Sequence, residues 1–347
     1  METINIGGLT LPTSRIGLGT WAIGGWMWGG SNALEAIRTI QTAVDQEINL
    51  IDTAPVYGFG RSEELVGRAL ESGGRRARAI IATKVGLEWI DGKIYRNSSP
   101  KRVREEVEDS LRRLRTDYID LYQVHWPDPS VPIEETAGEM GKLLVEGKIR
   151  AIGVSNYNAE EIARFEAVAP IHAVQPPYNL FERAAEKSTI PYAESRAMAI
   201  LAYGALCRGL LTGAITNYSS FPADDLRTRD PKFQQPRLGQ YLAAVGELAD
   251  LARTRYGKSV LALAVRWVLD RGNTVALWGA RRPDQLAPVA DVLGWHIDHE
   301  TMETIDRILT ENIRNPVGPE FMAPTEVPAL RSGAANVPPQ RVSATMS

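Results

Sequence analysis

Cysteine and histidine are the scarcest chemistry-bearing residues of this chain. Its 347 residues include one cysteine, Cys207, and four histidines. A single cysteine excludes an intrachain disulfide and a cysteine-rich metal site, and it fits a reducing compartment. The histidines form no HExxH pair of the kind that binds zinc. We therefore expect a cytoplasmic protein that carries no metal ion.

The sequence also lacks a strong excess of charge and a membrane-spanning run. Lysine and arginine number 39 against 42 aspartates and glutamates, a net charge of -3, which gives no broad field for nucleic acid or an anionic membrane. The longest uncharged stretch, residues 16–34, contains six glycines and is a poor transmembrane helix. The first residues lack the basic-then-apolar order of a secretory signal. We expect neither nucleic acid nor membrane as a partner, and the oligomeric state stays open.

Eight short apolar runs alternate with segments of helical period along most of the chain. Alternation of this kind is typical of βα units around a parallel sheet, and eight units in succession favour a closed (β/α)8 barrel. We expect one barrel domain over residues 1–314 and a proline-rich tail over 315–347. The expected strands are residues 14–21, 48–54, 79–85, 118–126, 149–156, 172–179, 198–204 and 274–280.

A doubly wound sheet is the alternative fold, because residues 17–22 read GLGTWA and match the GxGxxA dinucleotide fingerprint. That fingerprint needs a helix that starts within the motif, so that its amides face the pyrophosphate. The residues that follow, IGGWMWGG, are too glycine-rich for a helix. We therefore prefer the barrel, in which these glycines let the first strand pass close to a ligand.

Three helices have clear local signals. Ser99 and Pro100 supply an N-cap and a first-turn proline for a helix over residues 101–114, in which Val103, Val107 and Leu111 form one apolar stripe. Residues 259–272 and 299–309 are also predicted to be helical.

Two segments break the alternation of strands and helices. Residues 209–239 are too long for a simple connection and are expected to form a flap over a ligand. In the tail, residues 317–323 are expected to dock, and the last 15 or so to stay mobile.

Four chemistry-bearing side chains lie at or just after successive expected strands. Asp52 ends the second strand, Lys84 lies near the end of the third, His125 follows the fourth, and Tyr57 lies in the loop after Asp52. Each of them alone is most simply a cap or a core residue. Together they would converge at the C-terminal end of the barrel, where barrel enzymes place their active sites. An acid, an amine, a phenol and an imidazole in one concavity are suited to proton transfer.

The motifs around these residues resemble the aldo-keto reductase superfamily. They are IDTAPVYGFGRSEELVG, the lysine of IIATKVG, the histidine of DYIDLYQVHWPDP and the segment GKIRAIGVSN. The resemblance extends from residue 16 to about 309. The segments YGALCRGLLTG, WGARRPDQL and NPVGPEFMAP make it closest to the bacterial branch of general-stress reductases and NADP-linked glycerol or glyceraldehyde reductases.

This resemblance implies an NADPH-dependent oxidoreductase that interconverts small carbonyl compounds and alcohols, with glyceraldehyde and short- to medium-chain aldehydes as substrates and NADH as a weaker cofactor. Tyr57 would be the general acid, and the ammonium of Lys84 would lower its pKa. Asp52 would hold Lys84 charged, and His125 would donate a hydrogen bond to the substrate oxygen. A second candidate is a NADPH-binding regulatory subunit of a membrane channel or transporter. A barrel with lyase or isomerase chemistry is a third.

The resemblance also implies where NADPH would bind. Polar groups after the fifth and sixth strands would hold the nicotinamide carboxamide, Tyr203 would stack on the ring, and the loop after the seventh strand would pass under the pyrophosphate, with Arg208 as its charge partner. After the eighth strand, paired arginines would bind the 2′-phosphate. The expected contacts are Gly19, Thr20, Trp21, Ser155, Asn156, Gln175, Tyr203, Gly204, Leu206, Cys207, Arg208, Gly209, Gly279, Arg281, Arg282 and Gln285.

Two features leave details of the ligand site open. Trp278 precedes Gly279 where the family more often has Ile-Pro, and residues 287–290 replace a common Glu-Asn pair, so the adenine contacts are not predicted. Five tryptophans lie in or near the loops at the expected mouth and serve either as pocket walls or as packing beneath loops. They are Trp21, Trp26, Trp28, Trp89 and Trp126.

Overall fold

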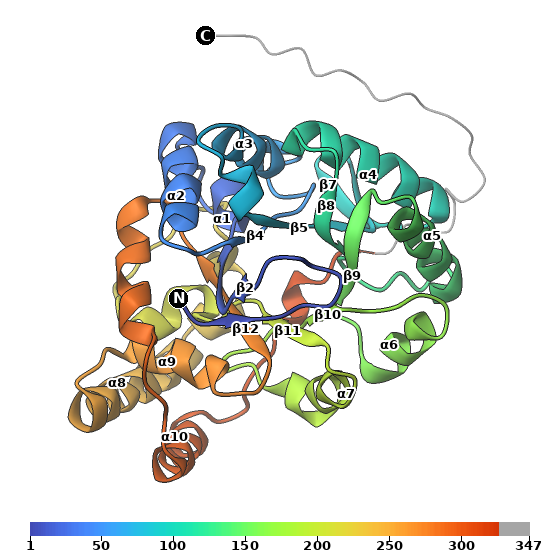
Figure 1. The fold of residues 1–347 in the computed structure, drawn as a ribbon. Helices are drawn as coiled ribbons and strands as arrows, with labels where there is room; N and C mark the ends of the chain where they lie inside the picture. The colour runs from blue at the N-terminus through green and yellow to red at the C-terminus, as the bar shows by residue number, and fades with distance from the viewer. Residues whose placement is uncertain (326–347) are drawn as a thin grey trace.

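Eight parallel strands form a closed barrel at the centre of the molecule (Figure 1). The computed structural model describes residues 1–325. Successive strands of the barrel are neighbours, and the last pairs with the first in the register Gly279↔Gly19. The predicted (β/α)8 barrel is confirmed. Its strands are β3 (Ile16–Gly19), β4 (Leu50–Asp52), β5 (Ile80–Val85), β8 (Ile119–Val124), β9 (Ile149–Ser155), β10 (Ala173–Gln175), β11 (Ala199–Ala202) and β12 (Thr274–Gly279).

Helices surround the barrel, and their ends follow local signals in the sequence. The Ser99 hydroxyl accepts from the amide of Arg102 at 3.3 Å, which caps helix α4, and Val103 and Val107 on this helix are fully buried. The helices predicted at residues 101–114, 259–272 and 299–309 are α4, α9 and α10. The α-helices of residues 1–325 are α1 (Trp21–Gly24), α2 (Ala33–Asp45), α3 (Arg61–Leu70), α4 (Pro100–Leu114), α5 (Ile133–Val145), α6 (Ala159–Glu166), α7 (Thr189–Ser195), α8 (Arg237–Tyr256), α9 (Val260–Leu269) and α10 (His299–Asn312).

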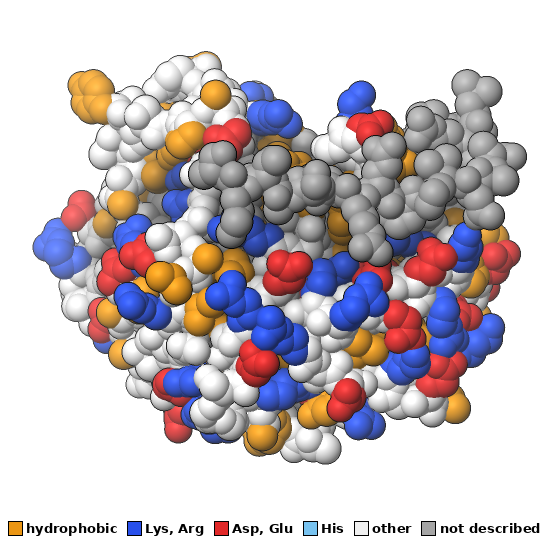
Figure 2. All heavy atoms as spheres, turned by 90° about the horizontal axis from the view of Figure 1, so that it is seen from above, with side chains coloured by type: hydrophobic (Ala, Val, Ile, Leu, Met, Phe, Trp, Pro, Cys, Tyr) orange, Lys and Arg blue, Asp and Glu red, His pale blue; other side chains and the backbone are white. Residues whose placement is uncertain are grey.

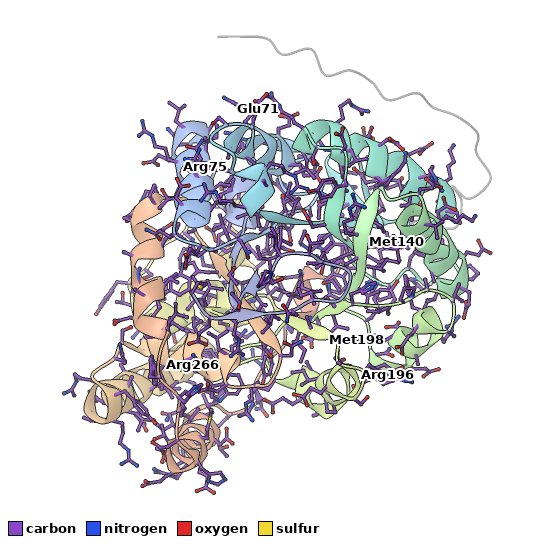
Figure 3. All side chains as sticks on the ribbon, in the orientation of Figure 1. Glu71, Arg75, Met140, Arg196, Met198 and Arg266 are labelled. Atoms are coloured by element: carbon purple, nitrogen blue, oxygen red, sulfur yellow. The ribbon has the colours of Figure 1, made fainter. Side chains whose placement is uncertain are left out.

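The hydrophobic core has two layers, one inside the barrel and one between strands and helices. Inside, Leu50, Leu121, Leu201 and Val275 come from four different strands and are fully buried. The outer layer joins the other faces of the strands to the helices, as in the packing of Met140 on α5, labelled in Figure 3. A side-chain-filled interior makes the barrel a rigid support, so function belongs to the loops at its ends.

Two antiparallel pairs that the sequence analysis missed flank the barrel. The pair β1 (Thr3–Ile4) and β2 (Thr13–Ser14) belongs to the N-terminal segment, whose Ile6 packs on the core inside the barrel. The hairpin β6 (Leu87–Ile90) and β7 (Lys93–Arg96) follows β5. Its turn residues Asp91 and Gly92 have φ values of 50° and 74°, the left-handed conformation that two-residue hairpin turns favour.

The expected flap, residues 209–239, contains short 3₁₀ turns joined by loops and ends in the first turn of α8. The amide of Leu226 donates to the carbonyl of Met27 at 2.9 Å, which ties the flap to the loop after β3. The 3₁₀ helices of the described chain are η1 (Arg76–Arg78), η2 (Ala184–Lys187), η3 (Cys207–Thr212), η4 (Leu226–Thr228), η5 (Pro231–Phe233), η6 (Pro283–Val292) and η7 (Glu320–Met322).

The C-terminal segment, which we define as residues 317–325, lies against the flap and the hairpin. The buried ammonium of Lys232 in the flap donates to the carbonyl of Gly318 at 3.1 Å. At the other end Thr325 forms a parallel bridge with Tyr95 of β7, and its hydroxyl donates to the carbonyl of Ile94 at 3.1 Å. The prediction of a mobile end falls on residues outside the described range.

The loop after β3 differs from the expectation in one respect. Trp21–Gly24 form α1, a single helical turn, where the glycine-rich sequence was expected to exclude a helix. The turn ends at Gly25, whose φ of 83° suits glycine. Because β3 belongs to a closed barrel, this short turn does not revive the doubly wound alternative.

Lysine, arginine, aspartate and glutamate side chains are interspersed over the face shown in Figure 2, without a wide region of one sign. Within residues 1–325, no helix combines the length and the apolar character needed to cross a bilayer.

Candidate active site

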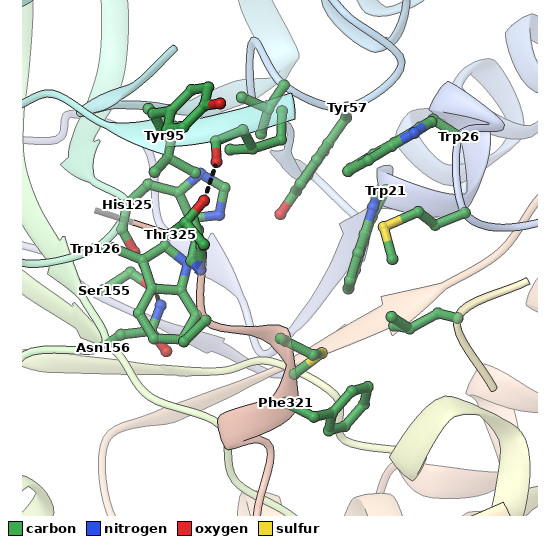
Figure 4. Close-up of a pocket in the computed structure, with 18 of the residues that line it drawn as sticks. Trp21, Trp26, Tyr57, Tyr95, His125, Trp126, Ser155, Asn156, Phe321 and Thr325 are labelled. Carbon is green, nitrogen blue, oxygen red and sulfur yellow. Dashed lines mark hydrogen bonds between the residues drawn. The ribbon is translucent and has the colours of Figure 1, made fainter. Parts of the chain in front are cut away.

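Three of the four predicted catalytic residues form a contact chain at one end of the barrel. The ammonium of Lys84 lies 2.6 Å from Oδ1 of Asp52 and 3.4 Å from the hydroxyl of Tyr57. The ring of His125 meets the ring of Tyr57 edge to face, with centroids 5.8 Å apart. Figure 4 shows the Tyr57 hydroxyl pointing into a pocket, toward the side that His125 occupies. The structure therefore brings the four side chains together.

Strand register explains how residues far apart in sequence meet. Asp52 pairs with Ala82 in β5, and Lys84 follows Ala82 by two residues. Asp52 likewise follows Leu50 by two residues, and because Leu50 and Ala82 pack in the core inside the barrel, alternation along the strands turns Asp52 and Lys84 to the same side. The second carboxylate oxygen of Asp52 accepts from Gln175 at 2.8 Å and from Gln123 at 3.2 Å. The buried carboxylate thus has a partner on each oxygen, which burial of a charge requires.

The loop that carries Tyr57 is held by close backbone contact with α1. Gly58 has a φ of 68°, and a Cβ built on it would lie 2.3 Å from the carbonyl oxygen of Gly24. No residue with a side chain fits this approach. The contact fixes the loop just after Tyr57, and the indole of Trp21 stacks on the Tyr57 ring with centroids 5.8 Å apart. The phenol therefore has a defined position above Lys84.

The ionisation of these groups differs in part from the expectation. Burial raises the pKa of Tyr57 well above its ordinary value of 10.0, and the negative charge of Asp52 raises it further. This net shift is opposite in direction to the predicted one, because burial and Asp52 set it. A lowering of this pKa by Lys84, which lies closer to Asp52 than to Tyr57, stays a prediction. Burial lowers the pKa of Lys84, and the negative charge of Asp52 partly offsets this by raising it. Tyr57 thus keeps its proton at neutral pH.

His125 is held in its neutral form. Burial lowers the pKa of His125 well below its ordinary value of 6.5, and the positive charge of Lys84 lowers it further. A neutral imidazole carries one N–H, which can donate to an oxygen in the pocket. The two groups that face the pocket, a protonated phenol and a neutral imidazole, can therefore both donate to one carbonyl oxygen.

A mostly apolar pocket of about 680 Å³ opens in front of Tyr57. Trp21, Trp26 and Trp126 line it and so serve as pocket walls, one of the two roles considered for the tryptophans. Trp28 and Trp89 do not appear in its lining: Trp28 lies near Arg227 of the flap, and Trp89 packs on Phe59. Apolar walls with a few polar anchors are typical of small-molecule sites.

Four of the predicted cofactor contacts form a polar wall beside Tyr57. Tyr203 donates to Oδ1 of Asn156 at 2.9 Å, and the Asn156 amide donates to the backbone carbonyl of His125 at 2.9 Å. Ser155 donates to the backbone carbonyl of Gln175 at 2.8 Å. All four line the pocket. Hydroxyl and amide groups in this number provide the donors and acceptors that a carboxamide needs.

Three other predicted contacts are turned into the protein. The hydroxyl of Thr20 donates to the carbonyl of Asp52 at 2.9 Å. Cys207 is fully buried, and burial raises the pKa of its thiol to about 12. Arg208 is bonded to Glu182 and Asp230, each at 2.5 Å. These two buried carboxylates also face Lys232, and the role of Arg208 as charge partner of the pyrophosphate stays a prediction.

The remaining predicted contacts lie at or after the ends of the adjacent strands β3 and β12 and in the loop after β11. Gly19 and Gly279 face each other across β3 and β12, and a Cβ at Gly279 would meet nothing within 4 Å. Beyond them the Gln285 side chain accepts from the amides of Arg281 and Arg282 at 2.8 Å and 3.2 Å, which shapes the turn. Gly204, Leu206 and Gly209 are all partly exposed in the loop after β11.

The two arginines of this turn differ in how their charge is used. Arg281 donates to the backbone carbonyls of Trp28 and Gly30 at 2.7 Å and 3.2 Å, and these acceptors do not neutralise it. Arg282 pairs with the exposed Asp284 at 3.2 Å. Open space next to Gly279 and the charge of Arg281 fit a phosphate-bearing dinucleotide, whose contacts here stay a prediction.

Sequence reasoning missed several residues of the site. Gln123 reaches the catalytic carboxylate, but its signal, a polar residue inside an apolar strand, was not used. Tyr95 and its neighbours line the pocket from the hairpin β6–β7, which the Asp91-Gly92 turn could have predicted. Residues 321–325 complete the lining, and Phe321 is labelled beside the pocket in Figure 4.

A closed (β/α)8 barrel with a paired lysine and aspartate, a tyrosine and a histidine at its open end defines a class of reductase. A family model described as the aldo/keto reductase family matches residues 15–310. The chain therefore belongs to this family. The predicted resemblance and the predicted enzyme class, a NAD(P)-dependent oxidoreductase of alcohol or aldehyde groups, are confirmed.

Individual relatives support this membership. The chain is 57% identical over 325 residues to the aldo-keto reductase YhdN of Bacillus subtilis, covering 93% of this chain and 98% of that one. It is 36% identical over 302 residues to an NADH-specific methylglyoxal reductase of Escherichia coli, covering 82% and 91%.

Solved structures agree with these relatives. A glycerol dehydrogenase from Gluconobacter oxydans has a TM-score of 0.85 and 56% identity, covering 92% of this chain and 99% of that one. An aldo-keto reductase from Klebsiella pneumoniae in complex with NADP and acetate has a TM-score of 0.69 and 27% identity, covering 88% and 94%.

Proposed function

We propose that this protein is an NADPH-dependent reductase of small aldehydes that also oxidises the corresponding alcohols. The carrying observation is the Tyr57 hydroxyl, which lies 3.4 Å from the Lys84 ammonium and points into an apolar pocket beside His125. Glyceraldehyde, with glycerol in the reverse direction, and short- to medium-chain aldehydes are the proposed substrates. The likeness to a glycerol dehydrogenase, 56% identical over nearly the whole chain, supports this choice.

In this proposal the chain's own residues bind the carbonyl and supply the proton. When bound, a reduced nicotinamide supplies the hydride. Neutral His125 donates its N–H to the carbonyl oxygen and polarises the bond. Tyr57, held protonated by burial, transfers its proton to the same oxygen as negative charge develops there. Lys84 and Asp52 fix the position of the phenol, and the aromatic walls exclude water.

NADPH is the preferred cofactor in this proposal. The polar wall of Ser155, Asn156, Gln175 and Tyr203 would hold the carboxamide, and Arg281 and Arg282 would bind the 2′-phosphate. The Klebsiella pneumoniae neighbour holds NADP, whereas the Escherichia coli relative is NADH-specific. The charge of Arg281, bonded only to carbonyl groups among its hydrogen-bond partners in residues 1–325, favours the phosphorylated cofactor.

The test is a panel of aldehydes and polyols, assayed with NADPH and NADH in parallel by the absorbance of the reduced nicotinamide. We expect turnover of glyceraldehyde and short-chain aldehydes, faster with NADPH. Turnover of none of them, with NADPH still bound, would favour a cofactor-binding regulatory subunit instead.

The cytoplasmic location remains a prediction from the single free cysteine.

A further inference from the structure

Among residues 1–325, the lining of the pocket includes two positive side chains and no aspartate or glutamate. Lys93, the first residue of β7, and Arg229, which follows η4 in the flap, are both exposed and both line the pocket. Within residues 1–325 neither side chain has a hydrogen bond or an ion pair. Two uncompensated cations therefore border a site whose walls are otherwise mostly apolar.

Arg229 differs from three other cations in the flap or directly before it. Arg208 is paired with Glu182 and Asp230, Arg227 is paired with Asp225, and Lys232 is paired with Glu182 at 2.8 Å. Each of these three cations is thus paired with a carboxylate, from the flap itself or from Glu182. Arg229 is different, since its charge is directed to the pocket rather than to a carboxylate of the described chain.

Acidic neighbours do not cancel these charges at the rim. Asp91, two residues before Lys93, and Glu320, next to Phe321, are exposed, and neither lines the pocket. Asp230, next to Arg229, is fully buried and committed to Arg208. The charge that residues 1–325 contribute to the pocket lining is therefore positive, although the whole chain carries -3.

We propose that the pocket favours carbonyl substrates that carry an anionic group, a carboxylate or a phosphate, a few carbons from the reacting carbonyl. This inference rests on the proposed reductase function. Tyr57 and His125 hold the carbonyl at the inner end, the aromatic walls contact the chain, and Lys93 and Arg229 bind the anion at the outer end. Cations at a pocket mouth also steer anionic substrates toward it.

Arg229 lies in the flap, and its anion could instead be a phosphate of the bound cofactor. A substrate anion and a cofactor phosphate would bind Arg229 through the same chemistry, but removal of Arg229 would affect activity differently in the two cases. A substrate contact changes the ratio of activities toward charged and neutral substrates. A cofactor contact weakens the binding of NADPH and lowers the activity toward all substrates alike.

The experiment compares two matched pairs of substrates: 4-oxobutanoate with its methyl ester, and glyceraldehyde 3-phosphate with glyceraldehyde. Each is assayed with the wild type, K93M, R229M and the double variant. Lys187→Met is the control, because Lys187 is exposed and lies outside the pocket lining. Tryptophan fluorescence gives the dissociation constant of NADPH for every variant, and it also follows the binding of 4-hydroxybutanoate and 1-butanol to the protein without turnover.

We expect the wild type to prefer the anionic member of each pair in kcat/KM. The double variant should reduce this preference about fivefold to fiftyfold, and added salt should reduce it in the wild type. K187M should leave this preference unchanged.

Equal use of both members by the wild type, with equal binding of the two alcohols, would overturn the inference. Loss of NADPH affinity in R229M without a change in preference would reassign Arg229 to the cofactor. Turnover of the neutral members alone would leave the reductase function standing and remove only the anion preference.

Discussion

The hydroxyl of Tyr57 points into the pocket beside His125 and is the proposed proton donor. Removal of that proton by Tyr57→Phe keeps the ring and its stacking on Trp21. A positioned general acid typically contributes about 10²- to 10⁴-fold. We expect kcat for aldehyde reduction to fall by a factor in that range, with NADPH binding, measured by fluorescence, unchanged. Near-normal turnover in Y57F would assign the proton to another group.

The buried carboxylate of Asp52 raises the pKa of Tyr57, because a nearby negative charge opposes phenolate. Asp52→Asn removes that charge, so the pKa of Tyr57 falls and the phenol loses its proton at lower pH. The alkaline decline of kcat/KM for aldehyde reduction should therefore move to lower pH. Asp120→Asn is the control, since Asp120 is also buried but pairs with Arg76 at the start of β8. A decline that stays in place or moves to higher pH would contradict this account.

The arginines after β12 set the cofactor preference in the proposed function. Hydrogen bonds to charged groups contribute about 1.5–3 kcal/mol each, so loss of both should be costly for a phosphorylated cofactor alone. We expect the double variant R281A/R282A to lose about tenfold to several hundredfold in kcat/KM for NADPH, with NADH little affected. Arg253→Ala, an exposed arginine of α8, is the control. Equal losses for both cofactors would remove the phosphate-binding role.

The flap is anchored by a buried group of four charges rather than by apolar contact alone. Asp230 and Glu182 face Arg208 and Lys232, and all four side chains are at most 4% exposed. The loss of one partner leaves a buried charge uncompensated, which costs about 3–5 kcal/mol. Asp230→Asn should lower the unfolding temperature and expose the flap to limited proteolysis. Asp224→Asn, an exposed site in the same flap, should change neither. The same melting and cleavage for both variants would refute the anchoring role.

The elements that could be predicted from sequence are those with a signal of their own. Each barrel strand is a short apolar run between polar loops, and α4 has its cap at Ser99. The hairpin β6–β7 also had a signal, Asp91-Gly92 between alternating apolar residues, but the search for βα units overlooked it. The ion pairs of Arg208 had no local sequence signal, because its partners Glu182 and Asp230 lie 26 and 22 residues away in the chain. For the same reason, no local pattern shows that Phe321 lines a pocket in front of Tyr57.

The two ends of the barrel divide stability from function. Ile6 is 2% exposed and packs inside the barrel in the N-terminal segment, whereas Phe321 lies in the pocket lining with the catalytic side chains. In barrel enzymes the C-terminal ends of the strands carry the chemistry, and the opposite end contributes stability. Replacing an apolar side chain by alanine should therefore lower stability at one end of the barrel and affect substrate binding at the other.

Ile6→Ala removes a buried side chain and should lower the free energy of unfolding by about 2–5 kcal/mol, while kcat and KM, measured well below the melting temperature, stay unchanged. Phe321→Ala removes a partly exposed wall and should leave the unfolding temperature nearly unchanged, yet raise KM for a short-chain aldehyde about fivefold or more. Thermal unfolding and steady-state kinetics on both variants check the pair. A KM that rises in I6A as much as in F321A would mean that the barrel core transmits strain to the pocket, because close-packed interiors can carry it between ends.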